Sequence, residues 1–274
     1  MYRCSGKGGN RMVFDNIVLD GKDSIAIVRM NRPQSLNALS TGHLTDLVKG
    51  LELCAEDEGV RCVILTGQGR AFCSGGDIGE FRDSLDTNPS EPLRQIIKLL
   101  NIAILAIRTM RKPVIAAVNG AAGGAGISLA AACDLRICVA SARFRQAYTS
   151  LGLVPDGAWA LLVPLLIGFS RANELMLLDP VFDARQALEW GLVNRVVEDA
   201  ELEREALELA GHLARGATTA FAIAKENMNH SMMDLLERQL ERERSGMIRA
   251  GKTRDYQEGA RAFFAKRRPE FTGK

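Results

Sequence analysis

Two glycine-bearing turns constrain the fold of this chain more than any other feature. The first, Phe72–Asp77, reads FCSGGD, and the second, Asn119–Gly126, reads NGAAGGAG; each follows a β-branched, apolar run. Glycine lets the backbone turn sharply and approach a ligand closely. Two such turns can direct N–H groups at one oxygen, an arrangement that stabilises negative charge developing on a carbonyl. The sequence therefore predicts a site built from backbone donors at the ends of two strands.

The composition is that of a globular protein with a mild net charge. The chain has 274 residues, of which 47% are hydrophobic and 25% charged, enough for one sizeable core or one core with a helical appendage. A net charge of +2 and a pI near 8.2 are too mild for a nucleic-acid partner. The basic cluster Lys266-Arg267-Arg268 is typical of a solvated helix end, and secondarily of a phosphate contact.

The cysteine pattern indicates neither a metal site nor a disulfide framework. No CxxC pair occurs, and no histidine lies at ligand spacing. The six cysteines are Cys4, Cys54, Cys62, Cys73, Cys133 and Cys138. Three of them, Cys62, Cys133 and Cys138, lie in apolar runs and are predicted to be small buried side chains, which suits a reducing compartment.

The N-terminal residues do not have the pattern of a signal peptide. The first ten residues lack its apolar stretch, and no apolar run in the chain reaches the roughly 18 residues of a membrane span. We therefore expect a cytoplasmic protein with no membrane partner. Residues 1–13 are predicted to be a flexible leader.

Short β-rich runs alternate with helical periods from residue 14 onward, which is typical of an α/β protein. Examples are the predicted helix Thr41–Glu58 and the predicted strands Val60–Thr66 and Val114–Val118. The pattern divides the chain into a core over 14–198 and a helical region over 199–274, which packs on its own chain or on a neighbouring copy. Helices are predicted over Ala200–Ala214, Thr218–Asn229, Met232–Arg249 and Lys252–Lys266.

Two nucleotide-binding arrangements are disfavoured, and one loop is singled out. No GxGxxG follows the first strand of the 60–140 region, and no Lys-Ser or Lys-Thr follows the glycines of Gly120–Gly126, so neither a Rossmann fold nor a P-loop is predicted. The polar, proline-containing stretch Ser84–Pro92 is predicted to be a loop, and a plausible mobile lid.

Several motifs together resemble the crotonase, or enoyl-CoA hydratase/isomerase, superfamily. They are NRP (Asn31–Pro33), LNAL (Leu36–Leu39), AFCSGGDI (Ala71–Ile78), PVIAAVNG (Pro113–Gly120), CD (Cys133–Asp134), and WGLV (Trp190–Val193) after Ala187. The resemblance extends from about residue 14 to the C-terminus. It implies an α/β spiral of ββα units, a C-terminal helical layer used in trimerisation, a homotrimer or hexamer, and an acyl-CoA thioester substrate.

The same resemblance places the two oxyanion donors on the backbone N–H groups of Ser74 and Ala125. The second position is more often glycine in hydratases, but alanine keeps the N–H. Hydratases of the family carry glutamates where this chain has Ser128 and Tyr148. Because adding water across a double bond benefits from two carboxyl groups, efficient hydration is disfavoured.

One carboxylate, Asp156, lies eight residues beyond Tyr148. Its loop, Gly152–Gly157, resembles that of single-aspartate isomerases of aromatic-acid degradation and of 4-chlorobenzoyl-CoA dehalogenases. Partial desolvation would strengthen it as a base. The sequence therefore predicts a double-bond or ring isomerase in which Asp156 carries the proton through an enolate.

Three alternatives stay open. A hydratase would have to activate water with Asp156 alone. A dehalogenase needs a histidine after the first turn, yet residues 78–118 contain none; the three histidines are His43, His212 and His230. Finally, Asp156 lies before a helical pattern and is a good N-cap residue, in which case the protein is a non-catalytic relative that binds acyl-CoA or acts as an assembly scaffold.

The resemblance also implies the residues that contact the acyl-CoA. They are Gln34, Ala38, Gly75, Gly76, Asp77, Ile78, Gly124, Ser128, Tyr148 and Lys266. Asp77 is predicted to be a helix cap rather than a catalyst. Lys266 is the candidate for a phosphate of coenzyme A, from its own or a neighbouring subunit. We expect no metal and no cofactor, because coenzyme A is part of the substrate.

Overall fold

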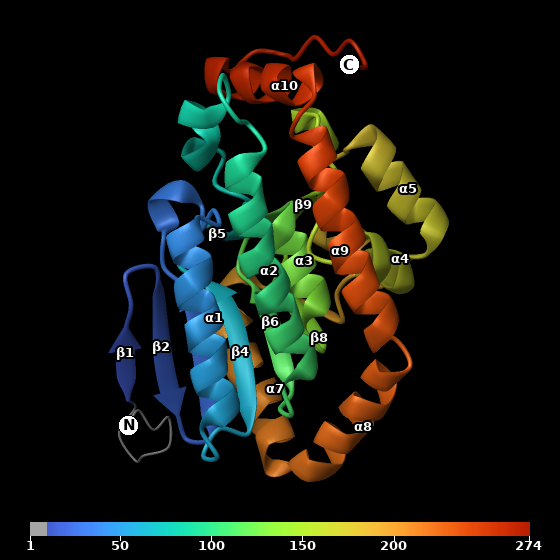
Figure 1. Cartoon of the computed structure of the whole chain (residues 1–274). Helices are drawn as coiled ribbons and strands as arrows, with labels where there is room; N and C mark the ends of the chain where they lie inside the picture. Colours follow the sequence, from blue (N-terminus) through green and yellow to red (C-terminus); the bar gives the residue numbers. More distant parts are fainter. Residues whose placement is uncertain (1–9) are drawn as a thin grey trace.

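The computed structural model describes residues 10–274 and contains two β-sheets surrounded by helices (Figure 1). The strands of the large sheet are, in spatial order, β1 (Arg11–Val13), β2 (Ile17–Lys22), β3 (Ile25–Met30), β4 (Cys62–Gly67), β6 (Val114–Val118), β8 (Leu135–Val139) and β11 (Arg195–Val197). The first three strands pair antiparallel, and from β3 to β11 every pair is parallel. Every residue of β4 and β6 is buried, as expected for central parallel strands.

The small sheet gives the fold its repeating unit. Its strands are, in order, β10 (Phe182–Asp183), β9 (Arg143–Arg145), β7 (Ala121–Gly123) and β5 (Ala71–Cys73). Strands β5, β7 and β9 are parallel to one another, and each directly follows one strand of the large sheet: β4, β6 and β8 respectively. A helix then follows each pair, so the predicted spiral of ββα units is confirmed.

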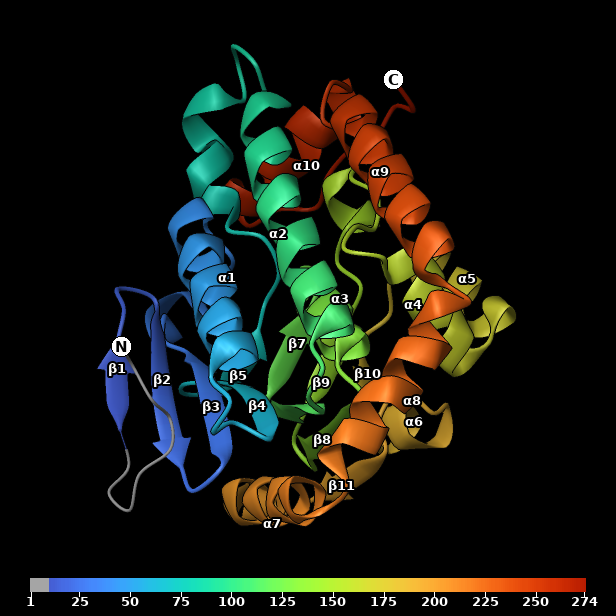
Figure 2. The same ribbon diagram turned by 60° about the horizontal axis from the view of Figure 1, so that its bottom comes forward.

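Ten α-helices surround the sheets in the described residues. They are α1 (Thr41–Glu56), α2 (Glu91–Thr109), α3 (Ala125–Ala132), α4 (Trp159–Ile167), α5 (Phe169–Leu178), α6 (Ala184–Glu189), α7 (Leu202–Arg215), α8 (Thr218–His230), α9 (Met233–Ala250) and α10 (Arg254–Ala265). Helix α2 packs between α1 and α9, and α10 lies across the end of this layer (Figure 1). Helix α7 packs on β3, β4, β6 and β8 and lies at the opposite end of the molecule (Figure 2). None of these helices is both long and apolar enough to cross a bilayer.

Local sequence signals explain the helix boundaries that matter for the site. The Ser40 side chain accepts the His43 N–H and thereby caps α1, while Pro92 occupies the first turn of α2, where a missing N–H is tolerated. Helix α3 is buried along its whole length and packs on the core, so its small side chains let the neighbouring elements approach closely.

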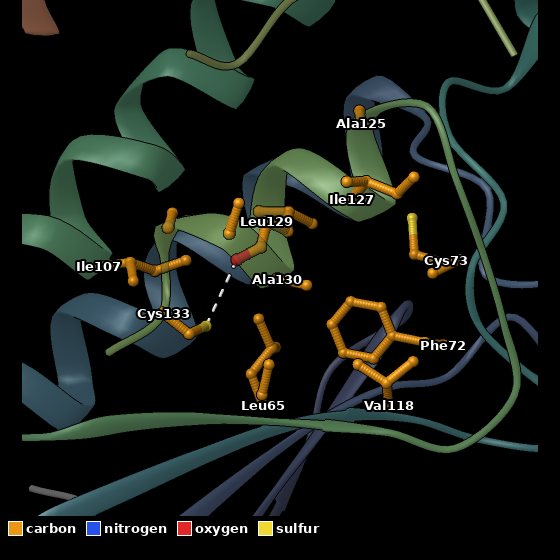
Figure 3. Close-up of a cluster of buried hydrophobic side chains, with 14 of the residues drawn as sticks. Leu65, Phe72, Cys73, Ile107, Val118, Ala125, Ile127, Leu129, Ala130 and Cys133 are labelled. Atoms are coloured by element: carbon orange, nitrogen blue, oxygen red, sulfur yellow. Dashed lines mark hydrogen bonds between the residues drawn. The ribbon is translucent and has the colours of Figure 1, made fainter. Parts of the chain in front are cut away.

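The core connects the first turn to α3. Phe72 and Cys73 lie beside Val118 and Ile127 in Figure 3, and all four side chains are buried. The Cys133 thiol donates to the Leu129 carbonyl at 3.3 Å, which the figure draws as a dashed line. The five cysteines of the described residues are buried and form no disulfide, which confirms the prediction for Cys62, Cys133 and Cys138.

Two predictions need correction. The leader predicted over residues 1–13 is wrong for Arg11–Val13, which form β1 and pair with β2. Only Met12 of this strand is partly buried, and Arg11 and Val13 are exposed. Residues 1–9 lie outside the described part of the chain. The loop predicted over Ser84–Pro92 is shorter than predicted, because Ser84 ends a 3-10 helix and Glu91 and Pro92 belong to α2. Gln257 of α10 donates to the Leu85 carbonyl and Arg261 pairs with Asp86, while the mobility of the loop stays a prediction.

Candidate active site

A cavity of about 700 Å3 opens where the two glycine-bearing turns meet. Eleven of the predicted site residues line it: Gln34, Ala38, Ser74, Gly75, Gly76, Asp77, Ile78, Gly124, Ala125, Tyr148 and Asp156. Ser128 and Lys266 are not among the lining residues. Helices α2, α9 and α10 contribute an apolar part of the remaining wall, with Leu93, Ile96, Leu100, Met247 and Phe263 among its residues.

The first turn is held against the segment that precedes α1. Leu39 donates its N–H to the Gly75 carbonyl at 2.8 Å, and Asp77 donates to the Leu39 carbonyl at 3.0 Å. The Ser74 N–H donates to the Leu36 carbonyl at 3.1 Å. The predicted donor therefore already has an acceptor, which a substrate oxygen must share or replace.

Asn37 explains why this neighbouring segment is rigid. Its side chain is buried, donates to the carbonyls of Gln68 and Ala71 at 3.0 and 2.8 Å, and accepts the Arg32 N–H. It also adopts a left-handed backbone conformation, with φ at 55°, which asparagine tolerates better than most residues. One asparagine thus fixes the rim of the cavity to β5.

The second turn requires glycine for two reasons. Gly124 has φ 49° and ψ −125°, a conformation open to glycine alone, and a Cβ on Gly126 would lie 2.2 Å from the Cys73 carbonyl oxygen. Ala125 is the first residue of α3, so its N–H has no acceptor within the helix and carries the positive end of the helix dipole. This N–H is therefore suited to bind an oxyanion.

Asp156 is a buried carboxyl group that still reaches the cavity. Its residue is 6% exposed, and burial raises the pKa of its carboxyl to about 6, although the hydrogen bond from Tyr148 opposes this shift. The Tyr148 hydroxyl donates to Asp156 Oδ1 at 2.7 Å. A carboxyl with this pKa is ionised near neutral pH and is a stronger base than an exposed aspartate.

Ser128 supports Asp156 from behind instead of lining the cavity. Its hydroxyl donates to the backbone carbonyl of Asp156 at 2.7 Å and lies 3.5 Å from the Tyr148 hydroxyl. Burial also raises the pKa of Tyr148 well above its ordinary value, so the phenol stays protonated and acts as a donor. Two neutral hydroxyl groups therefore stand at the positions where hydratases of this family carry glutamates.

The two aspartates of the cavity wall differ in what they bind. The Asp77 side chain accepts the Gly79 N–H at 3.1 Å and pairs with Arg32 at 2.9 Å, which confirms its prediction as a cap. The cap interpretation of Asp156 is wrong, because α4 begins at Trp159 after the N-cap residue Ala158, and the Asp156 carboxyl binds Tyr148 instead. Within residues 10–274, no other carboxylate lines the cavity.

None of the three histidines lines the cavity. His43 is buried on α1, with Nδ1 3.0 Å from the Ala38 carbonyl oxygen, and burial lowers its pKa to about 4. His212 and His230 lie on α7 and α8. The site therefore lacks the histidine that dehalogenation was expected to need. Residues 10–274 also contain no group of three His, Cys, Asp or Glu side chains placed to hold a metal ion.

The basic residues of the cavity wall differ from the one predicted. Arg70, Arg145, Arg267 and Arg268 line it, whereas Lys266 is the exposed C-cap of α10. Arg267 is paired with Glu258 through two contacts, at 2.5 and 2.9 Å. The helix ends at Lys266, so the two residues beyond it turn toward the cavity.

Sequence reasoning missed Glu243, a buried carboxylate of α9. It lies in the buried stripe Leu236, Leu240, Glu243 and Met247, and this charged residue within an apolar stripe is the signal that marks it. Burial raises the pKa of Glu243 to about 7. The backbone N–H groups of Ala158 and Ala160, at the start of α4, donate to its carboxylate.

Residues 20–274 match the enoyl-CoA hydratase/isomerase family, and the chain belongs to that family. It is 39% identical over 251 residues to the 1,2-epoxyphenylacetyl-CoA isomerase of Escherichia coli (strain K12), covering 91% of this chain and 95% of the relative. It is 36% identical to a probable enoyl-CoA hydratase of Rhodobacter capsulatus, covering 96% of this chain and all of the relative. The crystal structure of an enoyl-CoA hydratase from Mycobacterium avium subsp. paratuberculosis superposes with a TM-score of 0.85 at 35% identity, covering 95% of this chain and 100% of that one.

Proposed function

We propose that the protein isomerises an acyl-CoA thioester, by moving a double bond or rearranging a ring, with Asp156 as the only proton carrier. The observation that carries this proposal is that residues 10–274 leave one carboxylate available in the cavity: of the two aspartates of the wall, Asp77 is used as a cap and an ion-pair partner. An isomerase needs only one such group, because the base that removes a proton can return it elsewhere on the same substrate.

The steps balance with one carboxylate. The ionised Asp156 removes a proton from the carbon α or γ to the thioester carbonyl, and the electron pair moves to the carbonyl oxygen. The Ala125 N–H and the N-terminal end of α3 stabilise the resulting enolate, and the Ser74 N–H joins them when it exchanges the Leu36 carbonyl for the enolate oxygen. The protonated Asp156 then returns the proton to the other carbon, and the carbonyl forms again.

The surroundings of Asp156 favour return of the proton over addition of water. The carboxyl is buried beside an apolar wall that includes Leu100, Leu153 and Met247, and a substrate that fills this space displaces solvent. Tyr148 holds Oδ1, which leaves Oδ2 to face the reacting carbon. No metal and no cofactor takes part in this proposal.

Hydration is the second candidate, because the relatives include proteins named as hydratases. It would require Asp156 alone to activate water and to protonate the product. For coenzyme A, we propose that its phosphates meet Arg267 and Arg268 in place of Lys266. The predicted cytoplasmic location stays a prediction.

We also propose that the chain forms a homotrimer or hexamer. Large apolar side chains of α4, α5 and the following residues are more than half exposed: Leu165, Phe169, Leu177, Leu178 and Val181. An apolar surface of this kind is typical of a protein interface. Size-exclusion chromatography with light scattering tests this part, and a monomer at all concentrations would contradict it.

The test of the function is mass spectrometry of acyl-CoA thioesters incubated with the protein in D2O. The substrates are a 3-enoyl-CoA and 1,2-epoxyphenylacetyl-CoA, and the proteins are the unmodified chain, Asp156→Asn, and Asp83→Asn as an exposed control. We expect isomerisation without a water adduct, lost only in Asp156→Asn, by roughly 10²–10⁴-fold. A water adduct can form only after the 3-enoyl-CoA has become the conjugated 2-enoyl-CoA, so its appearance would support hydration following isomerisation. Equal rates in all three proteins would contradict the catalytic role of Asp156.

A further inference from the structure

The segment that carries Asp156 has an unfavourable backbone conformation. Gly157 and Ala158 are consecutive left-handed residues, with φ values of 66° and 63°. Glycine adopts this conformation freely, but alanine does not. Such a residue persists only where its surroundings hold it in place.

One support comes from inside the fold. The Ser128 hydroxyl donates to the Asp156 carbonyl at 2.7 Å. A Cβ on Gly157 would lie 2.9 Å from the Ser128 Cβ and 3.0 Å from Leu100, so the segment is packed tightly on this side. These contacts hold Asp156 and Gly157, and none of them involves the N–H group of the strained Ala158.

The other support is Glu243, on α9. Its Oε2 accepts the Ala158 N–H at 2.7 Å, and its Oε1 accepts the Ala160 N–H at 2.9 Å. Glu243 is 6% exposed, and Gln239, one turn earlier on α9, donates to Oε1 at 3.3 Å. A carboxylate at a helix N-terminus satisfies N–H groups that have no acceptor within the helix and interacts favourably with the helix dipole.

Glu243 contacts the start of α4 and does not line the cavity itself. Met247, one turn later on α9, does line it. Helix α9 packs on both α2 and α4, so the carboxylate is anchored on a helix that is itself part of the core. The segment between Asp156 and α4 is thus held by two hydrogen-bonding side chains, Ser128 at the Asp156 carbonyl and Glu243 at the Ala158 N–H.

We propose that Glu243 is a positioning residue for the reaction: by binding the N–H groups of Ala158 and Ala160, it fixes the strained start of α4 and so aims the Asp156 carboxyl at the substrate. This inference rests on the proposed function. It predicts that the rate of the chemical step depends on a side chain that never touches the substrate.

The test compares Glu243→Gln with Glu241→Gln, an exposed control on the same helix that pairs with Arg244. Glutamine has one acceptor oxygen, so one of the two N–H groups loses its partner. We expect kcat in Glu243→Gln to fall roughly 10- to 100-fold, since small misplacements of a reacting group have effects of this size, with KM changed less than about threefold. Glu241→Gln is expected to match the unmodified protein. The folded fraction is measured by circular dichroism, and a kcat per folded molecule equal to that of the unmodified protein would overturn the inference.

A rescue variant separates positioning from general destabilisation. Ala158→Gly removes the strain that Glu243 opposes, so adding it to Glu243→Gln should restore a large part of kcat. Absence of any rescue would overturn the inference. Should Glu243→Gln fail to fold, Glu243→Asp, which keeps the charge but reaches less far, is expected to show a smaller loss of kcat with the same rescue.

Amide hydrogen exchange, read by mass spectrometry on peptides covering residues 156–162, needs no substrate. We expect exchange in this segment to be about tenfold faster in Glu243→Gln and unchanged in Glu241→Gln. Unchanged exchange in Glu243→Gln would overturn the inference, whereas an unmodified protein that isomerises no thioester would overturn the proposed function and leave these contacts standing.

Discussion

The two sides of the cavity are made of different parts of the polypeptide. One side presents the backbone N–H groups of Ser74 and Ala125, the proposed oxyanion donors, which are fixed by glycine turns. The other side presents the side chains of Asp156, the proposed proton carrier, and Tyr148, supported by Ser128 and Glu243 from two other helices. The first side depends on close packing of backbone against backbone, and the second on hydrogen bonds between residues far apart in sequence. Disruption of the first should therefore affect the fold, and disruption of the second mainly the chemistry.

Gly126→Ala should have the largest effect. Its Cβ would lie 2.2 Å from the Cys73 carbonyl oxygen, so β5 and α3 must separate. We expect a loss of about 3 kcal/mol or more in the free energy of unfolding, together with loss of activity. The matched control is Gly76→Ala, because nothing lies within 4 Å of a Cβ there. Urea denaturation measures the free energy of unfolding of both variants. Equal values would show that close backbone packing between β5 and α3 does not stabilise this side of the cavity.

Ala125→Pro should remove one oxyanion donor while leaving α3 intact. Proline lacks the N–H but is tolerated at the first position of a helix, which Ala125 occupies. We expect a loss of roughly 10²–10³-fold in kcat, measured by deuterium incorporation from D2O. Ala125→Gly keeps the N–H and should lose far less. Similar losses in both variants would indicate that the Ala125 side chain, and not its N–H, matters.

Asp156→Asn should stabilise the fold in a pH-dependent way. The pKa of this carboxyl is about 6 in the folded state, against 3.8 for an exposed aspartate, so the folded protein binds more protons between these values. The contribution of the Asp156 carboxyl to the free energy of unfolding therefore decreases as pH rises through this window. We expect the variant to be more stable by about 2–3 kcal/mol near pH 7 and little changed near pH 4, in thermal or urea unfolding. An equal change at both pH values would contradict the raised pKa.

Tyr148→Phe should have the smallest effect. The phenol hydrogen bond lowers the pKa of Asp156, so its removal should raise that pKa above 6 and shift the acidic limb of the rate profile to higher pH. We expect about a tenfold loss of rate near pH 6, recovered in part at higher pH. Tyr256→Phe is the control, because its buried hydroxyl has no partner among the described residues. A loss independent of pH would place Tyr148 on the substrate instead of on Asp156.

The backbone-built side could be predicted from the sequence because its signals are local. A glycine after a buried strand marks a turn, and both turns agree with the structure, whereas the ββα unit was implied by the resemblance to the family. Asp77 could be predicted as a cap for the same reason, since its partner Gly79 is two residues away.

The side-chain network could not be predicted in the same way, because its partners meet only after folding. Ser128 has a helical position that fits either the cavity wall or the core, and the structure places it behind Asp156. Glu243 is 85 residues from its partner Ala158. The short strands β1, β5, β7, β9 and β10 were not predicted from periodicity, because two or three residues are too few to show a period.

The hydrogen bond from the Ser74 N–H to the Leu36 carbonyl makes binding at this position a competition between two acceptors. An uncharged thioester carbonyl accepts a hydrogen bond more weakly than the amide carbonyl that it must displace, whereas an enolate oxygen accepts far more strongly. The exchange is therefore unfavourable while the substrate is intact and becomes favourable as charge develops. In the proposed reaction, competition from the Leu36 carbonyl therefore makes the Ser74 N–H contribute selectively to the transition state, and add little to the binding of substrate or product.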